Sequence, residues 1–254
     1  MRHRGSKFIG LHQYVTWQSG LKDGSKIVVS KKGPYLVSGN TPLSIMMILT
    51  NDEGVSWEWK EGKSLVTTPE YKLCRCGQSM TKPFCDDVCK TIAFDGTETA
   101  TRESYASREE RYEGPNLTLR DVGDLCSHAR FCMAAGKIWH LVDQDTKRAN
   151  ELVIQEANNC PSGRLTVNRS RSGKMAENKL NPSIVVVEDT GKGCSGPLWV
   201  RGGVRVESEG GARYETRNRI TLCRCGASTN KPFCNGNHKK VEFMDGLVPF
   251  TSSS

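Results

Sequence analysis

Apolar and polar residues alternate along much of this chain in short stretches that predict strands rather than long helices. The stretch 26–39 (KIVVSKKGPYLVSG) has two apolar runs separated by a Lys-Lys-Gly turn, which predicts two strands. A later stretch, 196–222, opens with the same Gly-Pro pair and alternates valine with charged residues before the turn signal Gly210-Gly211. The strands of each unit end at its first cysteine, Cys74 or Cys223. We therefore expect a mainly β protein in which one kind of unit occurs twice.

The region between these units has a different pattern. Four apolar residues recur at helical spacing and would share one face of a helix: Ala149, Leu152, Val153 and Ala157. After this helix, residues 166–193 are polar apart from the strand-like run SIVVVE at 183–188, and we interpret them as a connection. Trp57 and Trp59, at strand spacing in the first unit, are predicted to be core residues.

These patterns predict an order of segments. We expect an N-terminal tail over 1–24, a first β unit over 25–96, a linker over 97–113, an inserted α+β segment over 114–165, a connection over 166–195, a second β unit over 196–247 and a C-terminal tail over 248–254. Each β unit alone has too few apolar residues for a stable core. The two units are therefore expected to pack on each other about an internal pseudo-twofold axis.

The two β units also carry the main candidate ligands. CRCGQSMTKPFCDDVC from Cys74 aligns without a gap with CRCGASTNKPFCNGNH from Cys223, with nine of sixteen positions identical. The candidate ligands, all displaced by 149 positions, pair as Cys74/Cys223, Cys76/Cys225, Cys85/Cys234 and Cys89/His238. Such a repeat indicates that one metal-binding unit was built twice. Four sulfur or nitrogen ligands close in sequence suit zinc or an iron–sulfur cluster, and zinc accepts four cysteines, or three cysteines and a histidine, equally.

Composition narrows the alternatives. Eleven cysteines could form disulfides, but such frameworks suit short secreted chains and a C-x-C pair seldom has bridge geometry. No apolar run approaches the roughly 18 residues of a membrane span. The basic residues Arg2, Arg4 and Lys7 are compatible with a transit peptide. In the absence of a stronger signal, the expected location is the reducing cytoplasm. The net charge of +8 is dispersed, which disfavours nucleic acid and leaves acidic redox partners open.

The repeated motif resembles the CDGSH iron–sulfur domain of the NEET proteins, C-x-C-x2-(Ser/Thr)-x3-P-x-C-D-G-(Ser/Ala/Thr)-H. The second repeat matches at Cys223, Cys225, Ser228, Pro232, Cys234, Gly236 and His238, with Asn235 in place of Asp; the first matches at Cys74, Cys76, Ser79, Pro83, Cys85 and Asp86. The first repeat departs at Asp87, Val88 and Cys89. The resemblance implies a [2Fe–2S] site with three cysteines and one histidine in the second repeat, and an all-cysteine [2Fe–2S] site in the first. NEET domains are intertwined homodimers, so one duplicated chain is expected to replace two and to be a monomer.

The inserted segment resembles a single-cluster bacterial ferredoxin. Cys126, Cys132 and Cys160-Pro161 match that family's ligands, while Ala129 occupies the second cysteine position. Three thiolates imply a [3Fe–4S] cluster, with [4Fe–4S] as the alternative. His128 is a candidate fourth ligand, although a structural role is favoured. Cys194 is expected to be a free thiol, and the remaining histidines, His3, His12 and His140, to be surface or packing residues.

No P-loop, dinucleotide fingerprint or catalytic triad is found, so the chain is not expected to be an enzyme. The first hypothesis is electron transfer from the all-cysteine site to the His238 site, because four thiolates leave a cluster more negative and harder to reduce. The second is cluster delivery to an apo-acceptor protein, or redox sensing, through a labile His-ligated cluster. The third is a zinc-stapled interaction module.

Overall fold

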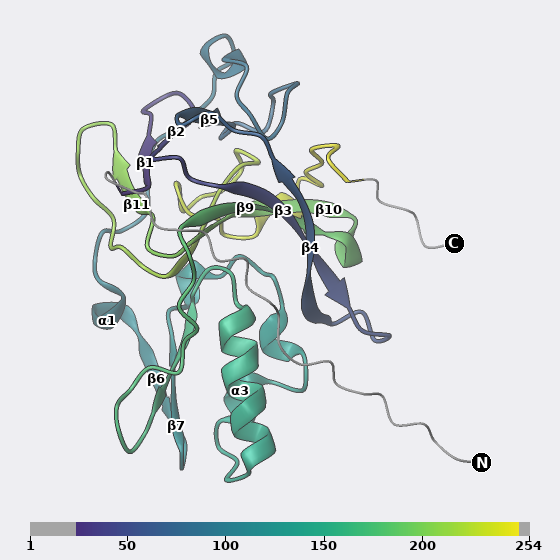
Figure 1. Ribbon diagram of the computed structural model, residues 1–254, viewed down its shortest axis with the longest axis vertical. Helices are drawn as coiled ribbons and strands as arrows, with labels where there is room; N and C mark the ends of the chain where they lie inside the picture. The colour runs from purple at the N-terminus through teal and green to yellow at the C-terminus, as the bar shows by residue number, and fades with distance from the viewer. Residues whose placement is uncertain (1–23, 249–254) are drawn as a thin grey trace.

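The computed structural model of the protein describes residues 24–248 (Figure 1). Apart from Gly24 and Val248, the predicted tails lie outside these residues, and so do the basic residues near Met1, His3 and His12. The first unit contains β1 (Lys26–Val29), β2 (Tyr35–Ser38), β3 (Leu43–Thr50), β4 (Ser56–Leu65) and β5 (Tyr71–Leu73). The second contains β9 (Ser183–Asp189), β10 (Cys194–Arg201), β11 (Arg205–Ser208) and β12 (Arg219–Leu222).

The two units exchange strands. One sheet has the order β11-β1-β2-β5, and the other has the order β12-β10-β9-β3-β4. β11 of the second unit runs parallel to β1, with Arg205 opposite Lys26. In return, β3 of the first unit runs parallel to β9, with Leu43 opposite Ile184. The last strand before each C-x-C motif, β5 or β12, is an edge strand next to β2 or β10.

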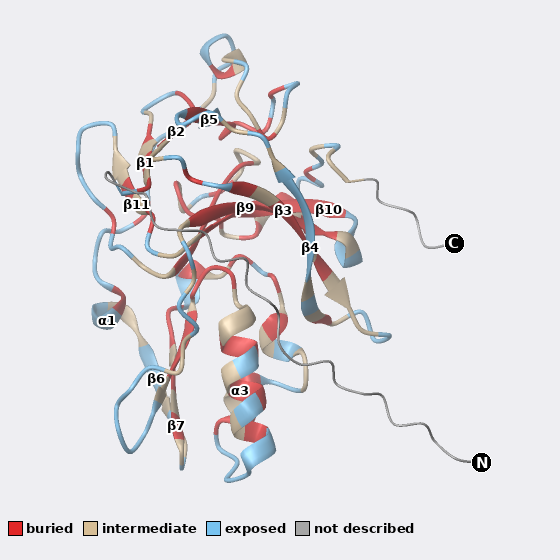
Figure 2. Cartoon of the chain, in the orientation of Figure 1, coloured by how far each residue is buried: buried red, intermediate tan, exposed pale blue. Residues whose placement is uncertain are grey.

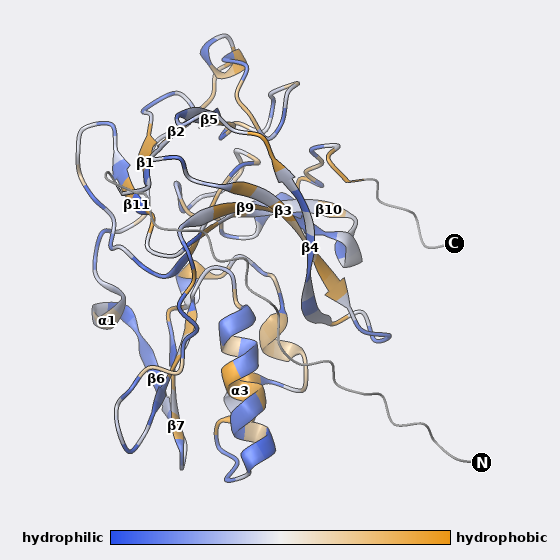
Figure 3. Ribbon diagram, in the orientation of Figure 1, coloured by the Kyte–Doolittle hydropathy of each residue, from blue (hydrophilic) through white to orange (hydrophobic). Residues whose placement is uncertain are grey.

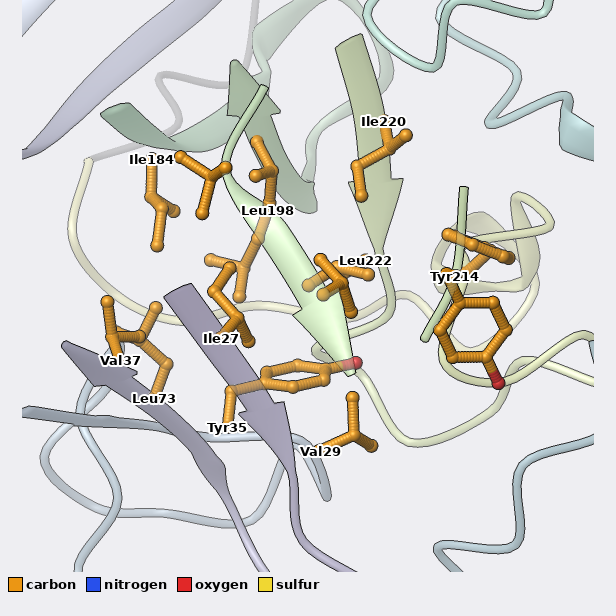
Figure 4. Packing of buried hydrophobic residues seen from close by; sticks show 14 of the residues in the cluster. Ile27, Val29, Tyr35, Val37, Leu73, Ile184, Leu198, Tyr214, Ile220 and Leu222 are labelled. Atoms are coloured by element: carbon orange, nitrogen blue, oxygen red, sulfur yellow. The ribbon is translucent and has the colours of Figure 1, made fainter. Parts of the chain in front are cut away.

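One hydrophobic core fills the space between these two sheets (Figure 4). Both units contribute fully buried side chains, among them Ile27, Val37 and Leu73 from the first and Ile184, Leu198 and Leu222 from the second. Burial is continuous along β9, which is shown in red in Figure 2. Each unit alone has too few apolar side chains for a stable core, and the two units together form one.

β9 is the main difference from the segment order expected from sequence. All seven residues of β9 are buried, and the strand lies in the interior of the five-stranded sheet, although 166–195 reads as a polar connection. A strand with neighbours on both sides and both faces covered shows no alternation of apolar and polar residues. The run SIVVVE is therefore a central strand. One of its neighbours in the sheet, β3, comes from a distant segment of the chain.

The inserted segment forms its own layer below the two sheets in Figure 1. It extends past the predicted bounds of 114–165 at both ends. Its elements are α1 (Tyr105–Arg108), β6 (Glu110–Glu113), β7 (Leu117–Asp121), α2 (Ile138–Leu141), α3 (Lys147–Asn159) and β8 (Leu165–Arg169). β6, β7 and β8 form an antiparallel sheet. Helix α3 buries the predicted face, and the mixed blue and orange of Figure 3 shows its amphipathic character. Glu156, also on that face, is buried as well.

An aromatic cluster joins the three parts of the chain. The ring of Trp59, from β4, lies 4.8 Å from the rings of Phe131 in the inserted segment and of Trp199 in β10. Its indole nitrogen donates a hydrogen bond to the carbonyl of Asn159, at 3.1 Å. Trp59 thus packs against the core, although it and Trp57, both predicted to be core residues, are only half-buried. Within residues 24–248, no helix is both long and apolar enough to cross a membrane.

Candidate metal centres

The two ligand loops are built by the same hydrogen bonds. The hydroxyl of Ser79 donates to the carbonyl of Phe84 at 2.7 Å, and the hydroxyl of Ser228 donates to that of Phe233 at 2.6 Å. In both loops the first cysteine's N–H donates to the carbonyl of the cis-proline, Pro83 at 2.9 Å or Pro232 at 2.8 Å. The repeated serine and proline thus fold each loop back, so that its second ligand pair faces its first.

Site one consists of two thiol pairs. The sulfurs of Cys74 and Cys76 are 3.7 Å apart, and those of Cys85 and Cys89 are 3.9 Å apart. Three of the four residues are buried and Cys85 is half-buried. Burial raises the pKa of Cys76 and of Cys85 to about 11, so a metal must displace protons from these thiols.

Site two repeats this arrangement with one nitrogen ligand. The sulfurs of Cys223 and Cys225 are 3.7 Å apart, and Nδ1 of His238 lies 3.4 Å from the sulfur of Cys234. His238 is only 3% exposed. Burial lowers the pKa of its imidazole to about 4, and the neutral ring is the form that binds a metal.

The ligands are arranged as pairs and not as tetrahedra around one point. Two ligands about 2.3 Å from one tetrahedral metal are separated by about 3.8 Å, which matches the distances within the pairs. Over residues 24–248, however, no three His, Cys, Asp or Glu side chains converge on a position for a single ion. A [2Fe–2S] cluster takes two protein ligands on each iron, so the donor set fits this cluster better than one structural zinc.

The last ligand of each site follows a left-handed residue. Asp87 has φ 66° and Gly236 has φ 84°, and each precedes a short 3₁₀ turn that carries Cys89 or His238. Aspartate is among the residues that tolerate this conformation. The departure of the first repeat at Asp87 therefore preserves the backbone path, and the backbone N–H of Asp87 still donates to the Cys85 sulfur at 3.3 Å.

The two sites touch through their C-x-C motifs. The backbones of Cys76 and Cys225 form an isolated antiparallel β-bridge. A Cβ on Gly77 would lie 2.7 Å from the carbonyl oxygen of Cys225, and one on Gly226 would lie 2.6 Å from that of Cys76. Tyr35 adds a further link, because its buried hydroxyl donates to the carbonyl of Cys223 at 2.7 Å. Tyr35 was not anticipated as a site residue, and the sequence holds no signal for it.

The outer faces of the two loops differ in exposure. Met80, at the tip of the first loop, is 88% exposed. The second loop is covered by the linker, where the N–H groups of Thr99 and Ala100 donate to the carbonyl of Lys231 at 2.8 and 2.9 Å. The inserted segment also covers it, since the Asn230 side chain donates to the carbonyl of Asp124 at 3.0 Å. The tip of the first loop is therefore exposed, while the second loop is covered. The ligands themselves are equally buried, since each site has three buried ligands and one half-buried cysteine, Cys85 or Cys225.

His128 lies against site two and not within a group of thiols. A Cβ on Gly236 would lie 2.3 Å from Cδ2 of His128. The ammonium of Lys239, the residue after the ligand His238, donates to the carbonyl of His128. Burial, followed by Lys239 and Arg164, lowers the pKa of His128. This placement makes His128 a contact between the inserted segment and the second loop.

The three cysteines of the inserted segment come together from separate turns. Cys126 follows the 3₁₀ turn Gly123–Leu125, Cys132 lies in the turn Phe131–Met133, and Cys160 ends α3. Burial, and then the neighbouring thiols of Cys160 and Cys126, raise the pKa of Cys132 to about 12. The thiols of Cys160 and Cys126 thus both lie near Cys132, and such a group suits a cluster in which each thiolate binds a different iron.

Cys194 does not join any of these groups. It begins β10 and is 3% exposed. Burial, followed by Asp189, raises its pKa to about 11. All eleven cysteines lie within the described residues and are free thiols.

Comparison with protein families agrees with this arrangement. Residues 32–88 and 195–239 match the iron-binding zinc finger of CDGSH type, and residues 112–170 match the divergent 4Fe-4S mono-cluster family. The second CDGSH-type match contains all four ligands of its loop. The first contains Cys74, Cys76 and Cys85 and ends one residue before Cys89, and the third match contains the three remaining candidate ligands. Searches of curated proteins and of solved structures gave no match.

Proposed function

We propose that this chain, in which two CDGSH-type iron-binding segments flank a divergent 4Fe-4S mono-cluster segment, is an electron-transfer protein and not an enzyme. When bound, iron–sulfur clusters supply reversible redox couples. Cys74, Cys76, Cys85 and Cys89 would hold one [2Fe–2S] cluster, and Cys223, Cys225, Cys234 and His238 the other. Cys126, Cys132 and Cys160 would hold a [3Fe–4S] cluster, or a [4Fe–4S] cluster with one further ligand.

The contact between Cys76 and Cys225 carries this proposal. This contact brings the two ligand sets next to each other, as transfer of an electron between them requires. The contact of His128 with the second loop then links site two to the inserted segment. Site two thus lies between site one and the three-cysteine site, an order that suits stepwise transfer.

We further infer that the two β units are related by an internal pseudo-twofold axis and that the chain is a monomer. The reciprocal strand pairs β1–β11 and β3–β9 support this relation, as do the reciprocal contacts of Gly77 and Gly226. A homodimer of one unit would need both exchanged strands from a second copy. Here one chain supplies all of them.

Ligand charge gives a direction to the transfer. Four thiolates make the oxidised site one more negative than site two, where neutral His238 replaces one thiolate, so site one is harder to reduce. Electrons would therefore run from site one to site two. The exposed tip of the first loop, at Met80, offers a surface that a redox partner protein could approach.

Anaerobic iron and sulfide quantitation with EPR of the as-isolated and reduced protein tests the proposal. Reversible reduction with the iron retained is the expected result. Transfer of iron and sulfide to an apo-acceptor protein, with loss of the chain's own signals, would instead favour cluster delivery. Stoichiometric zinc without visible absorbance would favour the stapled module. The burial of His238 and the cover over its loop argue against ready release of a cluster from site two.

A further inference from the structure

The arginine inside each C-x-C motif occupies the same place in the two units. Arg75 and Arg224 are each 2% exposed. The guanidinium of Arg75 lies 5.5 Å from the ring centre of Phe94, and that of Arg224 lies 5.2 Å from the ring centre of Phe243. Both arginines follow a buried ligand by one residue, so each places a positive charge beside its site.

Around Arg75 the partners are neutral. Its guanidinium donates to the carbonyls of Ser30 at 2.5 Å, Gly33 at 3.4 Å and Gly96 at 2.8 Å. Its ring contacts are Phe94 and Tyr35. Among the ion pairs of residues 24–248, none involves Arg75. Carbonyl dipoles satisfy the donors without cancelling the charge, so the first unit keeps a buried positive charge at its site.

Around Arg224 two of the partners are acids. Nη2 donates to Oε1 of Glu188 at 2.7 Å, and Nη1 pairs with the carboxylate of Asp245. Both acidic side chains are 0% exposed. Arg224 also keeps the carbonyl contacts of its counterpart, to Gly196 at 2.7 Å and Val187 at 3.0 Å.

The two acids stand where the first unit has no acid. Asp245 is displaced by 149 positions from Gly96, as the ligands are from one another. Glu188 follows Val187, whose carbonyl accepts from Arg224, just as Lys31 follows Ser30, whose carbonyl accepts from Arg75. The second unit thus has two carboxylates in place of a glycine and a lysine.

The pKa values of the two acids decide the net charge of the group formed by Arg224, Glu188 and Asp245, which is neutral or negative near neutral pH. Burial raises the pKa of Glu188 to about 7. Burial also acts on Asp245, but the charge of Arg224 outweighs it and lowers the pKa of that carboxyl. Asp245 is therefore ionised near neutral pH and cancels the charge of Arg224. Any ionised fraction of Glu188 adds negative charge.

We propose that these buried charges bring the reduction potentials of the two sites closer together, with Arg75 raising that of site one and the Glu188–Asp245 pair lowering that of site two. The inference rests on the proposed electron-transfer function. Added electrons are stabilised by nearby positive charge and opposed by negative charge, and burial weakens screening by water and salt. The buried charges act against the effect of the ligands, because Cys89 lowers the potential of site one and His238 raises that of site two. A smaller difference keeps transfer between the sites reversible.

The test is an EPR-monitored redox titration at pH 8 of the full chain with its clusters, for wild type, Asp245→Asn and Glu188→Gln. Each variant keeps side-chain volume and removes one carboxylate. We expect the equilibrium constant for reduction of site two to rise about ten-fold in Asp245→Asn, which corresponds to about 59 mV for one electron. Site one should not move, and the g-values of both sites should stay as in wild type, because no ligand changes.

The matched control is Asp95→Asn. Asp95 lies in the corresponding loop of the first unit next to Gly96, but its carboxylate is exposed. Solvent should screen this charge, so the control should shift site one much less than Asp245→Asn shifts site two. Repeating the titrations at high salt should leave the shift at site two in place.

Arg75→Gln provides an independent test at the other site. Glutamine can still donate to one of the carbonyls, and loss of the positive charge should lower the potential of site one. This variant keeps the inference testable if the second unit does not tolerate loss of a carboxylate. Reversible titrations in which Asp245→Asn and Arg75→Gln shift no more than Asp95→Asn would overturn the inference alone. A wild-type protein that cannot be reduced reversibly would overturn the proposed function, and the inference with it.

Discussion

Cys76 and Cys225 lie backbone to backbone, so the two metal-binding loops of this chain share one structural contact. The neighbouring glycines keep that contact close, because a methyl group on either would meet the other loop's cysteine carbonyl at 2.6–2.7 Å. The state of one loop is therefore expected to influence the other.

Gly77→Ala should destabilise both sites together. Gly77 has φ +77°, and its added methyl would lie 2.7 Å from the carbonyl oxygen of Cys225, so backbone must move. Gly54→Ala is the matched control, since Gly54 has φ +74° with nothing within 4 Å of its Cβ position. We expect the control to cost about 1–3 kcal/mol from backbone strain alone. Gly77→Ala should cost more and should release iron from both sites. Equal losses in the two variants, measured by denaturant unfolding, would argue against a tight contact.

Metal content should reflect three clusters. Two [2Fe–2S] clusters and one [3Fe–4S] cluster give about seven irons per chain, whereas a [4Fe–4S] cluster gives about eight. Cys132→Ala should remove only the irons of the inserted segment and leave about four. Colorimetric iron and sulfide determination on the anaerobic protein checks these values. Loss of all iron in Cys132→Ala would show that the three sites do not form separately.

The fourth ligands should exchange their properties when they are swapped. Cys89 and His238 both lie in 3₁₀ turns that follow a left-handed residue, so each backbone presents its ligand in the same way. Cys89→His should raise the potential of site one by roughly 100–300 mV, and His238→Cys should lower that of site two by a similar amount. Redox titration followed by EPR measures both. A site that keeps its potential after the swap would show that the fourth ligand does not set it.

Gly236→Ala should disturb the contact between site two and the inserted segment. The added methyl would lie 2.3 Å from the ring of His128, in addition to the strain of φ +84°. The double variant Gly236→Ala/His128→Ala removes the ring, leaves only Cβ of residue 128 at 3.1 Å and keeps the strain, so it should recover part of the lost stability. Thermal unfolding measures the stability, and the magnetic coupling between the cluster of site two and that of the inserted segment measures the contact. No recovery in the double variant would mean that backbone strain explains the whole effect.

The inserted segment should become less stable as pH rises. Burial raises the pKa of Glu156 from about 4.5 to about 7, and only one of its carboxyl oxygens accepts a hydrogen bond, from the N–H of Ala135 at 2.8 Å. The folded protein therefore holds a proton that the unfolded chain releases. This contribution is complete below pH 4.5 and is lost as pH rises to about 7.

Glu156→Gln should remove this pH dependence. The variant should gain about 1–3 kcal/mol over wild type at pH 8 and little at pH 5. Comparing unfolding midpoints of the two proteins at each pH cancels effects of acid on the clusters, which both share. If the midpoints of the two proteins differ by the same amount at pH 5 and pH 8, Glu156 does not titrate between these pH values.

Much of the site could be predicted from sequence because its ligands lie close together along the chain. The loop from Cys74 to Cys89 is fixed by hydrogen bonds within sixteen residues, and its copy from Cys223 is fixed in the same way. Long-range features could not be predicted. The central position of β9, the hydroxyl of Tyr35 on the other unit's loop and the acids around Arg224 all depend on pairings between distant segments.

The strand exchange also has a consequence for how the protein is made. β1 and β3 emerge early from the ribosome, but their partners β11 and β9 lie more than 130 residues later in the chain. Pairing across such separations slows folding. The first ligand loop is thus synthesised long before its final surroundings exist, and its thiols stay exposed to oxidants and competing metals for that interval. Loading of the first site is therefore expected to be a post-translational event, completed only once the last strands have been released.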